Sequence, residues 1–95
     1  ADHSVFAWLR RDGQGQMVLV VCNFTPVPRE GYWLGVPEGP LEWREVLNTD
    51  SRHYGGSDVG NGAAPVRVQE RGAHGRRQSI ALTLPPLATL FLTPA

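Results

Sequence analysis

The stretch "QSIALTLPPLATLFLT", residues 78–93, decides the fold class. In its first half Ile80, Leu82 and Leu84 alternate with small or polar residues, which is the pattern of a strand with one solvated face. The two prolines of "LPPL" end that strand, because proline lacks the amide hydrogen that a ladder needs. The segment "LATLFLT", residues 87–93, then starts another. The stretch therefore predicts two consecutive β-strands.

Outside this stretch, turn residues separate five more short segments with strand character, among them an Asp-Gly hairpin signal at Asp12 and Gly13. No window keeps the apolar period of a helix. The sequence therefore predicts an all-β fold, an antiparallel β-sandwich with Greek-key connections and about seven to eight strands. The five segments are Ser4 to Arg11, Gln16 to Phe24, Tyr32 to Val36, Glu42 to Asn48 and Pro65 to Glu70.

The length of the chain and its first residues indicate how the domain is organised. At 95 residues the chain has the size of one domain, so we expect residues 1–95 to form a single domain. The start, "ADHSVFAW", has no methionine and enters a strand-like segment almost directly. We therefore expect the chain to be cut from a longer polypeptide.

Two segments are apolar on both faces, unlike the others. A strand in an antiparallel sandwich has one outer face, so apolar residues on both sides predict that something covers that face. Either a loop of this chain or a neighbouring domain could do so. In the second segment Met17, Leu19 and Val21 oppose Val18, Val20, Cys22 and Phe24, and in the first Val5, Ala7 and Leu9 oppose Phe6 and Trp8.

Charge and cysteine content exclude several classes of partner. Nine arginines, with no lysine, balance nine acidic residues, so no net field attracts nucleic acid or an anionic membrane. No apolar run approaches the ~18 residues of a membrane span. Cys22 is the single cysteine and lies in an apolar run, where a small buried side chain is expected. These features predict a cytoplasmic protein without nucleic-acid or membrane partners.

The loop "NTDSRHYGGSDVGNG", residues 48–62, has no apolar period and consists mainly of turn-forming residues. It lacks the lysine of a phosphate loop, and no helix follows it. Asp50 and Asp58 do not have the spacing of a calcium loop. Ser51, His53 and Asp58 have no rigid element to align them as a catalytic triad. We expect a shaped, ordered loop instead.

Metal and two-carboxylate chemistry are also disfavoured. His3, His53 and His74 are far apart in the sequence and have no cysteine or carboxylate at zinc-ligand spacing. Glu42 and Glu45 lie on one strand but point to opposite faces. The sequence therefore predicts neither a metal site nor a catalytic pair in this chain.

An exposed tryptophan or tyrosine can stack on the apolar C–H face of a sugar ring. If Tyr32, Leu34 and Val36 face the core, Trp33 points outward from the same strand. Trp33 and Tyr54 are thus candidates for glucan stacking. Packing in a core or an interface is the more common role of such residues, and both interpretations stay open here.

Three motifs carry a resemblance that spans essentially the whole chain: "NFTPVPREGY" (23–32), "WREVLNTDSRHYGGSDVGNG" (43–62) and "SIALTLPPLATLFL" (79–92). In this order they resemble the C-terminal β-domain of bacterial 1,4-α-glucan branching enzymes, members of the α-amylase superfamily. The resemblance implies a parent enzyme whose catalytic (β/α)₈ barrel precedes this domain. Its acid/base Glu and nucleophilic Asp lie in that barrel, so no catalytic residue is expected in this chain.

The implied parent reaction cleaves an α-1,4 linkage of glycogen or a related α-glucan and transfers the cut chain to a 6-hydroxyl, forming an α-1,6 branch. This is two-carboxylate, retaining chemistry and requires no metal or organic cofactor.

The expected role of the domain is to cap and stabilise the barrel of the same polypeptide; the alternative is an accessory glucan-binding module that uses Trp33 or Tyr54. An independent enzyme is disfavoured because no catalytic set is present. The candidate inter-domain contacts are Asn48, Thr49, Asp50, Ser51, Tyr54, Gly55, Gly56 and Asn61.

Overall fold

The computed structural model describes residues 5–49, 61 and 64–95. This part of the chain contains no helix long and apolar enough to span a membrane. It contains seven strands, each paired antiparallel with its neighbours. They are β1 (Val5–Arg11), β2 (Met17–Asn23), β3 (Arg29–Val36), β4 (Glu42–Asn48), β5 (Val66–Arg67), β6 (Gln78–Leu84) and β7 (Ala88–Pro94).

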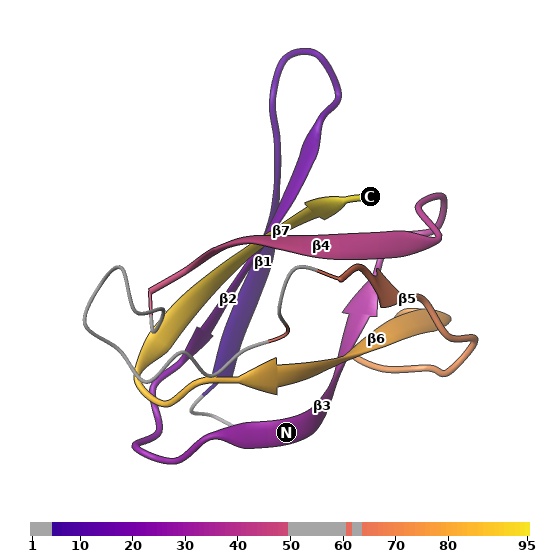
Figure 1. Cartoon of the computed structure of the whole chain (residues 1–95). Helices are drawn as coiled ribbons and strands as arrows, with labels where there is room; N and C mark the ends of the chain where they lie inside the picture. The colour runs from indigo at the N-terminus through magenta and orange to yellow at the C-terminus, as the bar shows by residue number, and fades with distance from the viewer. Residues whose placement is uncertain (1–4, 50–60, 62–63) are drawn as a thin grey trace.

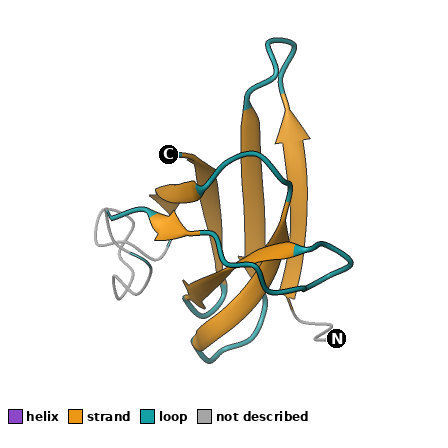
Figure 2. Ribbon diagram, turned by 90° about the vertical axis from the view of Figure 1, so that its right-hand side faces the viewer, coloured by secondary structure: helices purple, strands orange, loops and turns teal. Residues whose placement is uncertain are grey.

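The strands form two sheets (Figures 1 and 2). One has the order β1-β2-β7-β4-β5, and the other consists of β3 and β6. β7 lies between β2 and β4, so strands distant in sequence become neighbours, as Greek-key connections require. The sandwich prediction is confirmed. The stretch 78–93 supplies β6 to one sheet and β7 to the other, and the prolines lie where the chain crosses between them.

The core fills the space between the sheets and follows the predicted alternation. The inward side chains of β6 are fully buried, and Leu34 and Val36 of β3 meet them from the adjacent strand. Trp43 of β4 is 0% exposed and is among the largest of these side chains. The core cluster comprises Val5, Leu19, Val21, Leu34, Val36, Trp43, Ile80, Leu82, Leu84, Leu90 and Leu92.

The segment 65–70 is not the continuous strand that the sequence predicts. Only Val66 and Arg67 pair with β4. The amide of Val68 then donates to the carbonyl of Leu41, and Gln69 exchanges two backbone hydrogen bonds with Ser79 of β6. The segment therefore turns from one sheet to the other after two residues, because partners on both sheets satisfy its backbone groups in succession.

The β1–β2 hairpin predicted from the Asp-Gly pair is confirmed, with a different turn residue. Gly15, at φ 83°, takes the left-handed conformation, and Gly13 does not. The Oδ1 atom of Asp12 accepts hydrogen bonds from the amides of Gln14 and Gln16. The side chain of Asp12 thus fixes this loop, as is typical of aspartate in turns.

Candidate interaction face and cavity

A row of apolar side chains crosses the outside of the five-stranded sheet. Trp8 of β1 lies opposite Val20 of β2, Val20 opposite Phe91 of β7, and Phe91 opposite Leu47 of β4. Val20 is buried by its neighbours, whereas Trp8 is 48% exposed. Together with Phe6 and Phe24 this row forms what we call the outer apolar face.

Phe6 and Phe24 extend the outer apolar face at one end. Their rings meet edge to face with centroids 5.5 Å apart, and they remain 52% and 61% exposed. The prediction that strands β1 and β2 are apolar on both sides is therefore confirmed. The described part of the chain leaves this face open, so these residues provide no covering loop of their own.

Two arginines stand on the same side of the sheet as the outer apolar face. Arg10 is two residues beyond Trp8 on β1, and Arg44 lies opposite Thr93 of β7. Neither takes part in the ion pairs of the described residues, which join Arg67 to Glu42 and Arg77 to Glu38. The apolar row thus has cationic groups beside it.

The two ends of the glycine-rich loop are anchored within the domain. The amide of Thr49 donates to the carbonyl of Thr89, and the amide of Thr89 donates to the Oγ1 atom of Thr49. Asn48 is buried, and its Nδ2 lies 3.3 Å from Glu45 Oε2. The remaining candidate contacts, Asp50, Ser51, Tyr54, Gly55 and Gly56, lie outside the described residues.

Asn61 links the two sheets. Its Nδ2 donates to Glu45 Oε1 at 3.0 Å and to the carbonyl of Thr83 at 3.0 Å, and its Oδ1 accepts from the amide of Thr83 at 2.8 Å. Glu45 belongs to β4 and Thr83 to β6. The structure therefore places this candidate contact residue in bonds within the domain, which sequence reasoning did not find.

Replacement of Asn61 by alanine should lower the free energy of unfolding by about 1–2 kcal/mol, because three side-chain bonds are lost at a half-exposed site where water can replace them in part. Urea denaturation of the 95-residue chain measures this. Gln14→Ala is the control, since the side chain of Gln14 is exposed in the hairpin loop and should matter little. Equal midpoints for the two variants would contradict a linking role for Asn61.

Trp33 lies on the opposite face of β3 from Leu34 and Val36, as predicted, and is half-buried. The guanidinium of Arg71 stands 4.3 Å from its ring centroid. This cation–π contact occupies one face of the indole. The other candidate for stacking, Tyr54, lies outside the described residues.

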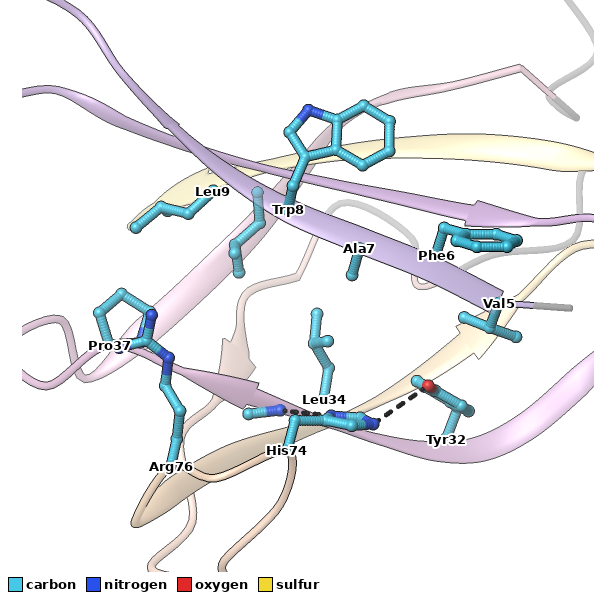
Figure 3. Close-up of a pocket in the computed structure, with 12 residues that line it drawn as sticks. Val5, Phe6, Ala7, Trp8, Leu9, Tyr32, Leu34, Pro37, His74 and Arg76 are labelled. Carbon is cyan, nitrogen blue, oxygen red and sulfur yellow. Dashed lines mark hydrogen bonds between the residues drawn. The ribbon is translucent and has the colours of Figure 1, made fainter. Parts of the chain in front are cut away.

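A cavity of about 400 Å³ lies between β1 and β3, the edge strands of the two sheets (Figure 3). Ala7 and Leu34 point into it from opposite sides, while the ring of Trp8 points away. Ala7 is exposed although it shares a face of β1 with the core residue Val5. Tyr32, His74 and Arg76 supply its polar lining.

A tight turn carries His74 to the cavity. Ala73 and Arg76 exchange two backbone hydrogen bonds, and His74 and Gly75 between them have φ angles of 51° and 75°. This is the type I′ geometry of a two-residue hairpin loop, for which a His-Gly pair is a weaker signal than Asn-Gly. Sequence reasoning considered His74 only as a metal ligand and did not find the cavity.

Among the described residues, no three histidine, cysteine, aspartate or glutamate side chains come together as a metal site would require. Cys22 is buried as predicted, and its Sγ lies 3.4 Å from the Oγ1 atom of Thr89.

Comparison with known proteins identifies a family with an all-β fold. The model of the alpha amylase C-terminal all-beta domain matches residues 1–95. The 1,4-alpha-glucan branching enzyme GlgB of Burkholderia pseudomallei (strain 668) is 61% identical over 94 residues, which are 99% of this chain and 12% of that protein. The 1,4-alpha-glucan branching enzyme GlgB of Burkholderia vietnamiensis (strain G4 / LMG 22486) is 55% identical, over 99% of this chain and 13% of that protein.

The chain thus spans only 12–13% of the length of the curated relatives that it matches. The family match covers it from end to end and confirms the resemblance that the three motifs indicate. Its two antiparallel sheets have the all-β architecture that the description of the family requires. The chain belongs to the alpha amylase C-terminal all-beta domain family.

Proposed function

We propose that this chain is the non-catalytic C-terminal domain of a cytoplasmic 1,4-α-glucan branching enzyme, and that it stabilises the catalytic barrel by packing its outer apolar face against it. The outer apolar face carries this proposal. Phe6, Trp8 and Phe24 are about half exposed and adjoin one another across β1 and β2. Contiguous exposed apolar patches of this kind mark interaction sites in soluble proteins.

We propose that the rest of the polypeptide covers the outer apolar face. The relatives carry this region as 12–13% of their length, so a much larger body of chain accompanies it there. A domain interface within a chain buries about 600–1,500 Å². Arg10 and Arg44 beside the face favour a barrel surface that has acidic groups around an apolar centre.

In the proposed parent enzyme the barrel supplies both catalytic carboxylates for cleavage of the α-1,4 link and transfer to a 6-hydroxyl. A deletion variant that lacks these 95 residues should therefore be poorly soluble or inactive, although its catalytic groups are intact. Branching activity is measured by the iodine colour of amylose. A barrel that keeps full activity and its original melting temperature would show that the domain does not stabilise it.

Trp8→Gln in the full-length enzyme tests the face itself. Loss of an aromatic anchor at the centre of an interface should cost about 2 kcal/mol and lower the melting temperature. In the 95-residue chain alone the same change should raise solubility, since it removes exposed apolar surface. Leu41→Asp is the control, because Leu41 is 69% exposed but precedes β4 and is not part of the outer apolar face.

If Leu41→Asp destabilised the full-length enzyme as much as Trp8→Gln does, the outer apolar face would have no special role. An unchanged melting temperature for Trp8→Gln would have the same meaning. We expect Trp8→Gln to lower the melting temperature of the full-length enzyme and to raise the solubility of the 95-residue chain. Damage to the domain itself would not raise solubility, so the two measurements distinguish it from loss of the interface.

A further inference from the structure

Two loops at one end of the sandwich present exposed apolar side chains. Residues 24–28 join β2 to β3, and residues 85–87 join β6 to β7. The amide of Leu87 donates to the carbonyl of Thr25 at 3.0 Å, so the two loops lie side by side (Figure 1). Val27 and Leu87 are both exposed. With Phe24, which also belongs to the outer apolar face, they form what we call the rim cluster.

Leu87 has a backbone conformation that is costly for its side chain. Its φ angle is 50°, in the left-handed region, and it follows Pro86 in the turn between β6 and β7. Glycine or asparagine usually occupies this position of a proline turn, because a bulky side chain disfavours a positive φ. The side chain of Leu87 is 68% exposed, so packing within the described residues does not offset the cost. Strain that persists without a local benefit is typical of residues with a binding function.

One buried side chain holds both loops in place. The Nδ2 atom of Asn23 donates to the carbonyl of Val27 at 3.2 Å and to the carbonyl of Pro85 at 3.0 Å. Its Oδ1 atom accepts from the amide and the hydroxyl of Thr25, at 3.0 and 2.6 Å. Prolines restrict the two loops further, at Pro26, Pro28, Pro85 and Pro86. The rim cluster is therefore preorganised and loses little conformational entropy when a partner binds.

The composition of the two loops indicates an apolar partner surface. The segments "FTPVP" (24–28) and "PPLA" (85–88) contain no charged residue, as is typical of the centre of a protein interface. The rim cluster is also continuous with the outer apolar face, because the ring of Phe24 meets that of Phe6. The relatives carry this region as 12–13% of their length, so the polypeptide that covers one surface can extend over the other.

We propose that the rim cluster is a second docking surface for the catalytic barrel of the parent enzyme, and that Leu87 is seated in an apolar pocket of that barrel. This rests on the proposed function, in which the barrel covers the outer apolar face. That face lies on a sheet, whereas the rim cluster lies at the end of the sandwich. Contact with the sheet alone leaves the domain able to slide or rotate on the barrel. A second, rigid contact at the end fixes its orientation.

Protection of position 87 from a soluble reagent tests this contact directly. Leu87→Cys is compared with Leu41→Cys in the full-length enzyme, because the two leucines are 68% and 69% exposed in the domain and Leu41 belongs to neither surface. Each variant is treated with N-ethylmaleimide, and mass spectrometry of the peptide that carries the new thiol separates it from Cys22. The thiol at position 87 should react at least about tenfold more slowly than the thiol at position 41.

Leu87→Asn separates the contact from the fold of the domain. Asparagine accepts the left-handed conformation, so the turn keeps its shape and loses its strain while the apolar side chain is removed. The melting temperature of the 95-residue chain should therefore stay the same or rise, whereas that of the full-length enzyme should fall. Leu41→Asn is the matched control and should leave the full-length enzyme unchanged.

Equal rates of modification at positions 87 and 41 in the full-length enzyme would overturn the second docking surface. A Leu87→Asn change that destabilises the 95-residue chain would also overturn it, because Leu87 would then serve the domain's own fold. If Trp8→Gln still lowers the melting temperature of the full-length enzyme, the proposed function survives either result. Absence of branching activity in the unaltered full-length protein would instead overturn the proposed function, so the two proposals fail in distinguishable ways.

Discussion

Trp43→Ala should remove a large share of the stability of the 95-residue chain and lower its urea midpoint strongly. Truncation of a fully buried tryptophan costs about 3–5 kcal/mol, and the whole chain has roughly 5–14 kcal/mol of stability. Trp43 is 0% exposed and lies in β4 between Val66 of β5 and Pro94 of β7. Its loss leaves a cavity where three strands meet. The urea midpoint, followed by far-UV circular dichroism, measures the effect.

Trp43→Phe is the matched control for that experiment. Phenylalanine keeps most of the aromatic volume and removes the indole N–H, which is buried and has no acceptor among the described residues. Removal of an unsatisfied donor offsets part of the lost packing. The phenylalanine variant should therefore lose less than half as much stability as the alanine variant. Equal losses would show that volume at this position does not determine stability.

Gly35→Ala should cost about 3 kcal/mol, although it adds a single methyl group. The new Cβ would overlap the carbonyl oxygen of Ala73 and lie 3.2 Å from the Cβ of Arg76. A backbone carbonyl cannot rotate away as a flexible side chain can, so the turn of His74 must move off β3. The hydrogen bond from the Gly35 amide to His74 is lost with it.

Thermal unfolding of the 95-residue chain measures this change, and Gly13→Ala is the control. Nothing lies within 4 Å of a Cβ at Gly13, and its φ is not positive. Gly13→Ala should thus be neutral or stabilising by up to about 1 kcal/mol through the unfolded state. A Gly35→Ala chain as stable as Gly13→Ala would show that the close approach is not required.

Local alternation was enough to predict most of the strands, though not the short β5 or the start of β3 at Arg29. Ile80, Leu82 and Leu84 are buried on one face of β6, and Trp33 faces away from Leu34 on β3, as the period of two requires. The burial of these residues follows from their own neighbours in sequence. The two-sided apolar character of β1 and β2 predicted a face that something covers, and the described residues leave Phe6, Trp8 and Phe24 on that face exposed.

The features that local alternation did not predict depend on distant partners. The segment 65–70 leaves its sheet because Leu41 and Ser79 provide hydrogen-bond partners on different layers. Asn61 bonds to Glu45 and Thr83, which are 16 and 22 residues away. The cavity is lined by residues of β1, β3 and the turn of His74, which are distant from one another in the sequence. These contacts cannot be predicted from a single segment of the sequence, because the partners lie in other segments.

The hairpin loop between β1 and β2 sets the register of the edge strand. Antiparallel pairing places Ala7 opposite Val21 and Trp8 opposite Val20, and the two bonds accepted by Asp12 fix the loop that produces this alignment. A slip of one residue exchanges the two faces of a strand. Deletion of one loop residue would therefore turn Trp8 toward the cavity and Ala7 outward, so loop length decides which side chains each face of the sheet presents.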